Sequence, residues 1–204
     1  MDRRESHILN LTVVVVVVLL ANLAVGEIPY GVSFIYNGLI LWMSVAYLKQ
    51  DFDIDIRTPQ GFSVKTVLSA AGLALLFAAA VVLFFFVFGE VSLFPPYRIR
   101  ISQLVLLLVL QLVVAFSEEA LFRFYLYEWL HANMRNRWGP IVIASLLFAL
   151  LHFVTGGIIK QTVISFVFSV YAFAIKRSKI GCPYYLCSMT HFLYNMCAFF
   201  VFSI

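Results

Sequence analysis

Residues 101–131 decide the fold, and they run ISQLVLLLVLQLVVAFSEEALFRFYLYEWLH without a glycine or a proline. At 1.5 Å per residue they predict one helix of about 46 Å, longer than the ~30 Å hydrocarbon core of a bilayer. Gln111 is the single polar residue within Leu104–Phe116, and Ser117–Arg123 then contributes two glutamates and an arginine. Because an ionised side chain near the bilayer centre costs about 3 kcal/mol, this cluster indicates a functional site.

The composition is that of a membrane protein. The chain has 204 residues, of which 63% are hydrophobic and 12% are charged, whereas a soluble domain carries about 25% charged residues. We therefore expect an integral, multi-pass protein of the lipid bilayer with a single domain over residues 1–204. No basic cluster is interleaved with aromatic residues, so nucleic acid is not an expected partner. The sequence carries no signal for the oligomeric state.

Apolar runs separated by Gly, Pro and charged residues predict the helical spans. They lie at Ile8–Val25, Val32–Leu48, Val64–Phe88, Ile101–His131, Gly139–Val154, Ile158–Ile175 and Pro183–Ser203. The predicted fold class is therefore all-α, a polytopic membrane bundle of about seven transmembrane helices. The first run could be a cleaved signal peptide, but its length favours a retained helix. Ten Lys and Arg residues flank one side and three flank the other, which predicts a cytoplasmic N-terminus.

The stretch Asp51–Ile56 alternates aspartate with apolar residues. This pattern could bind a metal ion, but we favour an interfacial segment in which Phe52, Ile54 and Ile56 face lipid. The three cysteines, Cys182, Cys187 and Cys197, all fall in the last segment of the chain and form no C-x-x-C pair. They are therefore expected to be packing residues and not disulfide or metal ligands.

Polar residues on three of the predicted helices fall at one depth. Glu118 lies 13 residues from the predicted cytoplasmic end of its helix, and His152 also lies 13 residues from the end of its own. His191 and Asn195 lie 9 and 13 residues from Cys182. These positions correspond to depths of about 13–20 Å, near the middle of the bilayer core. We therefore expect the three helices to form one polar site.

The spacing within each helix assigns candidate roles. Glu119 and Arg123 are four residues apart, an arrangement that pairs an acid with a base on one helix face. Glu118 is turned by about 100° from Glu119 and lacks that local partner, which makes it the better candidate for a proton acceptor. His191 and Asn195, one turn apart, could both donate hydrogen bonds to an oxyanion.

Three motifs stand in order on three separate predicted helices: Glu118-Glu119-x-x-x-Arg123, Phe148-x-x-x-His152 and His191-x-x-x-Asn195. Together they resemble the CPBP family of intramembrane proteases, the relatives of the CAAX-prenyl endopeptidase that are also called Abi proteins. The resemblance covers about residues 111–199, and it implies a glutamic-type endopeptidase that hydrolyses membrane-associated or lipidated peptides and proteins. Prenylated CAAX tails and bacteriocin leaders are the implied substrates.

The resemblance also implies a role for each residue. Glu118 and His152 would activate water, and His191 and Asn195 would stabilise the oxyanion, with the remaining motif residues Glu119 and Arg123 in support. No cofactor is expected. From the residue types alone, Glu118, His152 and His191 could instead form a three-ligand zinc site.

The alternative is a non-catalytic protein in which the same polar cluster serves binding and not hydrolysis. In that alternative the protein binds a peptide or confers immunity in the membrane. A transporter is disfavoured, because the chain has neither a two-half repeat nor paired broken helices. The short chain suits a prokaryotic cell membrane.

Overall fold

The computed structural model describes residues 2–25, 29–57, 62–88, 92–93, 100–156, 159–178, 180 and 182–203. Within them the helices are α1 (Arg3–Val25), α2 (Tyr30–Phe52), α3 (Val64–Val87), α4 (Ile101–Glu118), the π-helix η2 (Glu119–Leu126), α5 (Tyr127–Asn133), α6 (Gly139–Gly156), α7 (Ile159–Lys176) and α8 (Pro183–Phe200). Two short strands, β1 (Ser92–Leu93) and β2 (Phe202–Ser203), pair in antiparallel register.

The described residues form seven helical rods, because α4, η2 and α5 continue one another over 33 residues. Five of these rods are long and apolar enough to cross a membrane, namely α1, α2, α3, the continuous α4–α5 helix and α7. Helix α6 is a shorter apolar helix. The all-α polytopic bundle predicted from the sequence is thereby confirmed, whereas the orientation of the N-terminus stays a prediction.

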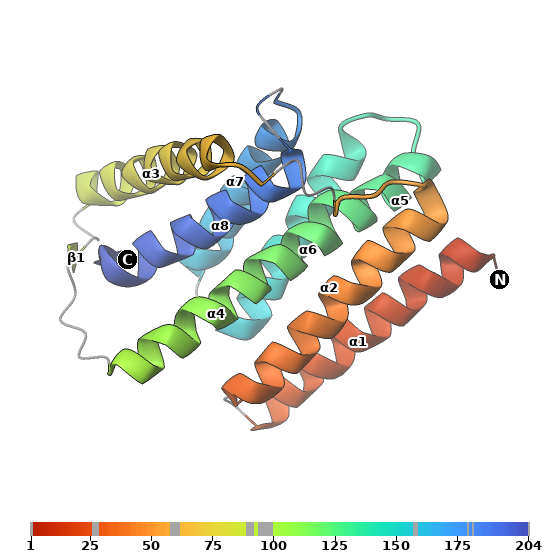
Figure 1. The fold of residues 1–204 in the computed structure, drawn as a ribbon, viewed down its shortest axis with the longest axis horizontal. Coiled ribbons are helices and arrows are strands. Elements are labelled where there is room, and N and C mark those ends of the chain that lie inside the picture. Colours follow the sequence, from red (N-terminus) through yellow and green to blue (C-terminus); the bar gives the residue numbers. More distant parts are fainter. Residues whose placement is uncertain are drawn as a thin grey trace.

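Helix α8 is less apolar than its neighbours because it carries the polar residues of the third motif. It lies inside the bundle, between α3 and α4 (Figure 1). Pro183 occupies its first turn, where the missing N–H costs no hydrogen bond. The polar side chains of this helix are therefore surrounded by protein and not by lipid.

Other helices pack in pairs around this centre. Figure 1 shows α1 and α2 side by side along one flank of the molecule, and α2 packs on α4. Helix α6 packs on α7 behind them. The three motif-bearing helices α4, α6 and α8 thus lie at the centre of the bundle, as the depth argument requires.

The segment after α2 corrects one prediction. Asp53 adopts a left-handed conformation (φ 56°) at the end of α2, a region that Asp tolerates better than most residues. The chain turns there and returns to the bundle, so that Ile56 is only 5% exposed and Phe52 and Ile54 pack against the core. The prediction that these apolar residues face lipid was therefore wrong.

Two of the aspartates in this segment form separate local ion pairs. Asp53 pairs with Lys49, and Asp55 pairs with Arg57 at 2.9 Å. The Arg57 guanidinium holds the pKa of the Asp55 carboxyl down at about 2. Because each carboxylate already has its own cation, the pattern does not assemble a metal site.

The remaining aspartate is the hub of a buried network that the sequence did not predict. The Asp51 side chain is fully buried, and it accepts hydrogen bonds from His7 Nδ1 at 2.9 Å and from the Tyr125 hydroxyl at 3.0 Å. Arg3 Nε lies 3.3 Å from the same carboxylate, and the His7 ring stacks on Tyr47. This network joins the first turns of α1 to the end of α2 and to the π-helix η2.

The helix boundaries differ from the predicted ones in small ways. Helix α1 begins at Arg3 and not at Ile8, because the charged leader is helical and is held by the Asp51 network. The last span ends at Phe200, after which Phe202 and Ser203 pair with β1. The predicted start of the sixth span, Ile158, lies outside the described residues. All three cysteines are free thiols, and Cys187 is buried, as expected for packing residues.

Candidate active site

A π-helix interrupts the long helix where its charges begin. Residues 101–133 are continuous, as predicted, but Glu119–Leu126 forms the π-helix η2, and all eight of its side chains are buried. Helices of this type have wider turns closed by i→i+5 hydrogen bonds, and they are rare and concentrated at functional sites. Lys176 of α7 supports this segment by donating a hydrogen bond of 2.8 Å to the main-chain carbonyl of Arg123.

Glu119 holds the centre of a buried ion cluster. Its side chain and that of Arg123 are both fully buried, with Arg123 Nε 3.4 Å from Glu119 Oε2. The other carboxylate oxygen accepts a hydrogen bond of 2.9 Å from His191 Nδ1. The Arg123 guanidinium also lies over the Phe148 ring at 3.9 Å, a cation–π contact. The ion pair predicted from the four-residue spacing is therefore present, and it reaches α8 through His191.

Glu118 is placed differently from its neighbour. Its side chain is 16% exposed, and its Oε2 atom lies 3.7 Å from Nε2 of His191. The two glutamates thus face opposite nitrogens of one imidazole. Because an ionised carboxylate only accepts hydrogen bonds, Glu119 fixes a proton on Nδ1 of His191. This contact orients the ring so that Nε2 points toward Glu118.

His152 is oriented by its own helix. Its Nδ1 donates a hydrogen bond of 3.0 Å to the main-chain carbonyl of Phe148. In the neutral imidazole this leaves Nε2 as the nitrogen that can accept a proton. The ring of Phe148 contacts both His152 and His191, with centroid separations of 4.4 Å and 5.8 Å. The Phe148 ring therefore contacts both histidines and also the Arg123 guanidinium.

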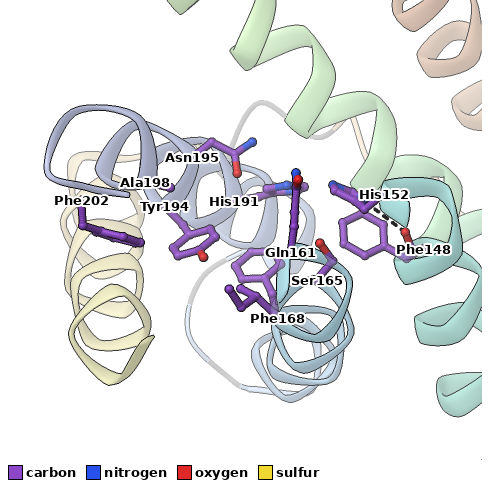
Figure 2. Close-up of a pocket in the computed structure, with 11 residues that line it drawn as sticks. Phe148, His152, Gln161, Ser165, Phe168, His191, Tyr194, Asn195, Ala198 and Phe202 are labelled. Atoms are coloured by element: carbon purple, nitrogen blue, oxygen red, sulfur yellow. Dashed lines mark hydrogen bonds between the residues drawn. The ribbon is translucent and has the colours of Figure 1, made fainter. Parts of the chain in front are cut away.

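Two cavities of similar size meet this group of side chains. The first, of about 270 Å³, lies among α6, α7 and α8, and its wall includes His152, His191 and Asn195. Figure 2 shows His152 and His191 pointing toward each other across it. The second, of about 260 Å³, is enclosed by α1, α2, the α4–η2 helix and α6, and its wall includes Glu118 and His152. His152 thus faces both cavities, and Glu118 faces one of them.

Asn195 lines the first cavity, and its side-chain amide makes a hydrogen bond. Asn195 Nδ2 donates a hydrogen bond of 3.1 Å to Gln111 Oε1 of α4. Gln111 therefore bonds between helices, and its partner is a candidate site residue. The sequence analysis did not single out Gln161 and Ser165 of α7, which also line this cavity. Their four-residue spacing, which puts both side chains on one face of the helix, was the available signal.

The three candidate zinc ligands are Glu118, His152 and His191. In the described residues, no three His, Cys, Asp or Glu side chains lie together in a way that could hold a metal ion. His191 already uses Nδ1 on Glu119, and His152 uses Nδ1 on a carbonyl. The Nε2 atom of each ring is therefore the nitrogen through which it could bind a ligand.

The comparison with protein families agrees with this geometry. Residues 100–197 match the family model described as type II CAAX prenyl endopeptidase Rce1-like. Searches of curated proteins and of solved structures gave no match. The matched segment contains all three motifs, the π-helix η2 and every residue of the ion cluster. Over residues 100–197, just under half of the chain, the protein is therefore similar to the Rce1-like type II CAAX prenyl endopeptidases, in line with the resemblance that the three motifs carry.

Proposed function

We propose that the protein is an intramembrane endopeptidase that hydrolyses a peptide bond of a membrane-associated or lipidated substrate. One observation carries this proposal. Glu118 is the carboxylate of the cluster that lines a cavity, and His152 lines the same cavity. The neighbouring Glu119 and Arg123 are fully buried behind it and neutralise each other. An acid and a base are thereby held together at a space that can admit water.

In the proposed reaction, the Glu118 carboxylate and His152 orient a water molecule, and one of them accepts its proton. The resulting hydroxide adds to the carbonyl carbon of the scissile bond and gives a tetrahedral oxyanion. The bond from that carbon to nitrogen then breaks, and the leaving amine takes up the proton that the base accepted. General acid–base catalysis of this kind typically contributes 10²–10⁴-fold to a rate.

Stabilisation of the oxyanion is assigned to His191 and Asn195. Preorganised donors aimed at a developing charge are worth about 10²–10³-fold each. His191 Nε2 can donate when the ring carries both protons, a form for which Glu119 on Nδ1 supplies a counter-charge. Gln111 holds the Asn195 amide from the opposite side. Glu119 and Arg123 are positioning residues in this scheme, because they act through His191 and not on the substrate.

The proposal needs no metal ion or other cofactor. Candidate substrates are CAAX-type lipidated tails and bacteriocin precursors in a prokaryotic cell membrane. A non-catalytic peptide-binding or immunity protein would use the same cavity, and it is distinguished by whether its effect on cells survives the loss of Glu118 and His152.

The test compares peptides released in membranes from cells that produce each variant. Wild type is expected to generate products that are absent with Glu118→Gln and with His152→Ala. The matched control is Glu5→Gln, the same chemical change at an exposed position of α1, which should behave as wild type. Identical products from all four proteins would rule the assignment out, provided that each variant is present in the membrane in equal amount.

A further inference from the structure

Two arginines from different connections of the chain meet on one exposed tryptophan. Arg137 lies just before α6, and its guanidinium carbon is 5.0 Å from the centre of the Trp138 ring. Arg177 lies just after α7, and its guanidinium carbon is 5.4 Å from the centre of the same ring. Arginine stacks on aromatic faces through cation–π contacts, so Trp138 holds both side chains at one place. We call these three residues the arginine–tryptophan cluster, and Figure 1 shows the two connections at the same end of the molecule.

The positive charge of this cluster is not compensated by nearby acids. Residues 131–138 and 176–182 together contain five Lys and Arg residues and no Asp or Glu. The carboxylate of Glu128 in α5 pairs with Lys176 at 2.9 Å. Among the described residues, neither arginine of the cluster has a carboxylate partner, and both are exposed. Two guanidiniums held at one point suit a phosphate group, which binds arginine through paired, charge-assisted hydrogen bonds.

Exposed apolar rows on α6 and α7 lead to the two arginines. On α6 the row repeats every four residues, a spacing that keeps side chains on one helix face, and its members are Trp138, Val142, Leu146, Leu150 and Val154. On α7, which packs on α6, the exposed row is Val163, Val167, Val170, Ala174 and then Arg177. In a membrane protein such rows face the hydrocarbon chains of the lipids. The cluster therefore presents positive charge directly above an apolar surface.

We propose that the arginine–tryptophan cluster binds a phospholipid with a negatively charged headgroup. The headgroup phosphate lies between Arg137 and Arg177, and an acyl chain follows the exposed rows of α6 and α7. A soluble anion would use the arginines but not the rows, and a lipid without net charge would leave the positive charge uncompensated. Tryptophan is enriched where the hydrocarbon meets the headgroups, the level that this arrangement requires. No residue of the cluster lines the two cavities of the candidate active site, so lipid binding here is independent of the proposed hydrolysis.

Tryptophan fluorescence of the purified protein in lipid discs tests the proposal. The chain has three tryptophans, so the parent protein Trp42→Phe/Trp129→Phe leaves Trp138 as the reporter. The discs contain either brominated phosphatidylglycerol, which is anionic, or brominated phosphatidylcholine, because bromine quenches a tryptophan that touches the lipid. Phosphatidylglycerol should occupy the site roughly 25-fold more strongly than phosphatidylcholine, since attraction to an anionic lipid contributes about fivefold for each of the two arginines.

Removal of the two charges should abolish the preference. In the parent protein, Arg137→Gln/Arg177→Gln should make the two lipids quench equally, and undiminished quenching by phosphatidylcholine checks that this variant is still folded in the bilayer. The matched control is Lys65→Gln/Arg135→Gln, which removes the same charge from two other exposed positions and should keep the preference.

Three results would overturn the site. The first is an unchanged preference in Arg137→Gln/Arg177→Gln, and the second is an equal loss of preference in the control, which would mean that general surface charge attracts the lipid. The third comes from inorganic phosphate added in excess. Phosphate should leave the preference for phosphatidylglycerol unchanged, and its abolition by phosphate would assign the arginines to a free anion and not to a lipid.

Discussion

Replacement by glutamine should have different effects at the two adjacent glutamates, on folding at one and on catalysis at the other. Glu119→Gln removes the charge that compensates the fully buried Arg123 and that accepts a hydrogen bond from His191. Glu118→Gln changes a partly exposed carboxylate with a single 3.7 Å contact to that histidine. We therefore expect Glu119→Gln to damage folding and Glu118→Gln to damage only chemistry.

The size of the expected loss of stability follows from the burial of the Glu119–Arg123 ion pair. Removing one partner of a buried ion pair typically costs about 3–5 kcal/mol, because the other charge is left uncompensated. For a chain of this size, 1 kcal/mol moves the midpoint of thermal unfolding by roughly 2–4 °C, so Glu119→Gln should lower it by roughly 6–20 °C. Glu118→Gln should lower the unfolding midpoint by less than Glu119→Gln does, because Glu118 is not the carboxylate paired with the buried Arg123.

Thermal unfolding in detergent micelles measures the difference, with a thiol-reactive dye that reaches buried Cys187 only when the bundle opens. The double variant Glu119→Gln/Arg123→Gln removes both charges and should recover part of the loss, with a coupling energy of about 0.5–3 kcal/mol. Equal midpoints for Glu118→Gln and Glu119→Gln would refute the reasoning, as would a double variant that is less stable than the sum of its single changes.

Three further results are expected. Asp51→Asn should destabilise the protein by about 3 kcal/mol, because His7 and Tyr125 lose a shared buried carboxylate; an unchanged unfolding midpoint would contradict this. Gln111→Leu should lower kcat about tenfold with little change in KM, because the Asn195 amide loses the partner that orients it; a change confined to KM would argue for a role in binding. Cleavage should continue in the presence of EDTA, and loss of activity that zinc restores would favour the metal alternative.

Much of the fold follows from hydrophobic runs. The third span was predicted over Val64–Phe88 and is observed over Val64–Val87, because Ser63 caps its start and the apolar run ends with it. Gly139 likewise marks the start of α6. The conversion of the fourth helix into the π-helix η2 was not predictable, since its residues are ordinary helix formers and the wider turn depends on packing against α2, α6 and α8.

Contacts that join distant parts of the chain were the hardest to predict. The i, i+4 spacing gave the pair of Glu119 and Arg123, because both lie on one helix. No local pattern joins Asp51 to its two partners, because His7 lies 44 residues and Tyr125 74 residues away in the sequence. Ile56 was misplaced for the same reason, since only the turn at Asp53 returns it to the core.

The depth of a residue along its helix can be predicted from sequence for a membrane site. That prediction brought Glu118, His152 and His191 to one layer, where the structure shows His191 beside Glu118 and His152 between two cavities. It could not show that His191 stands between the two glutamates, because rotation of a helix about its axis depends on tertiary packing.

The most direct measurement of the central claim is the fate of water oxygen. Purified protein in lipid discs would be incubated with a library of membrane-anchored peptides in water enriched in ¹⁸O, and the new carboxyl termini analysed by mass spectrometry. Wild type should place one ¹⁸O atom in each new terminus, and Glu118→Gln should give no product above background. Equal incorporation by wild type and Glu118→Gln would contradict the account.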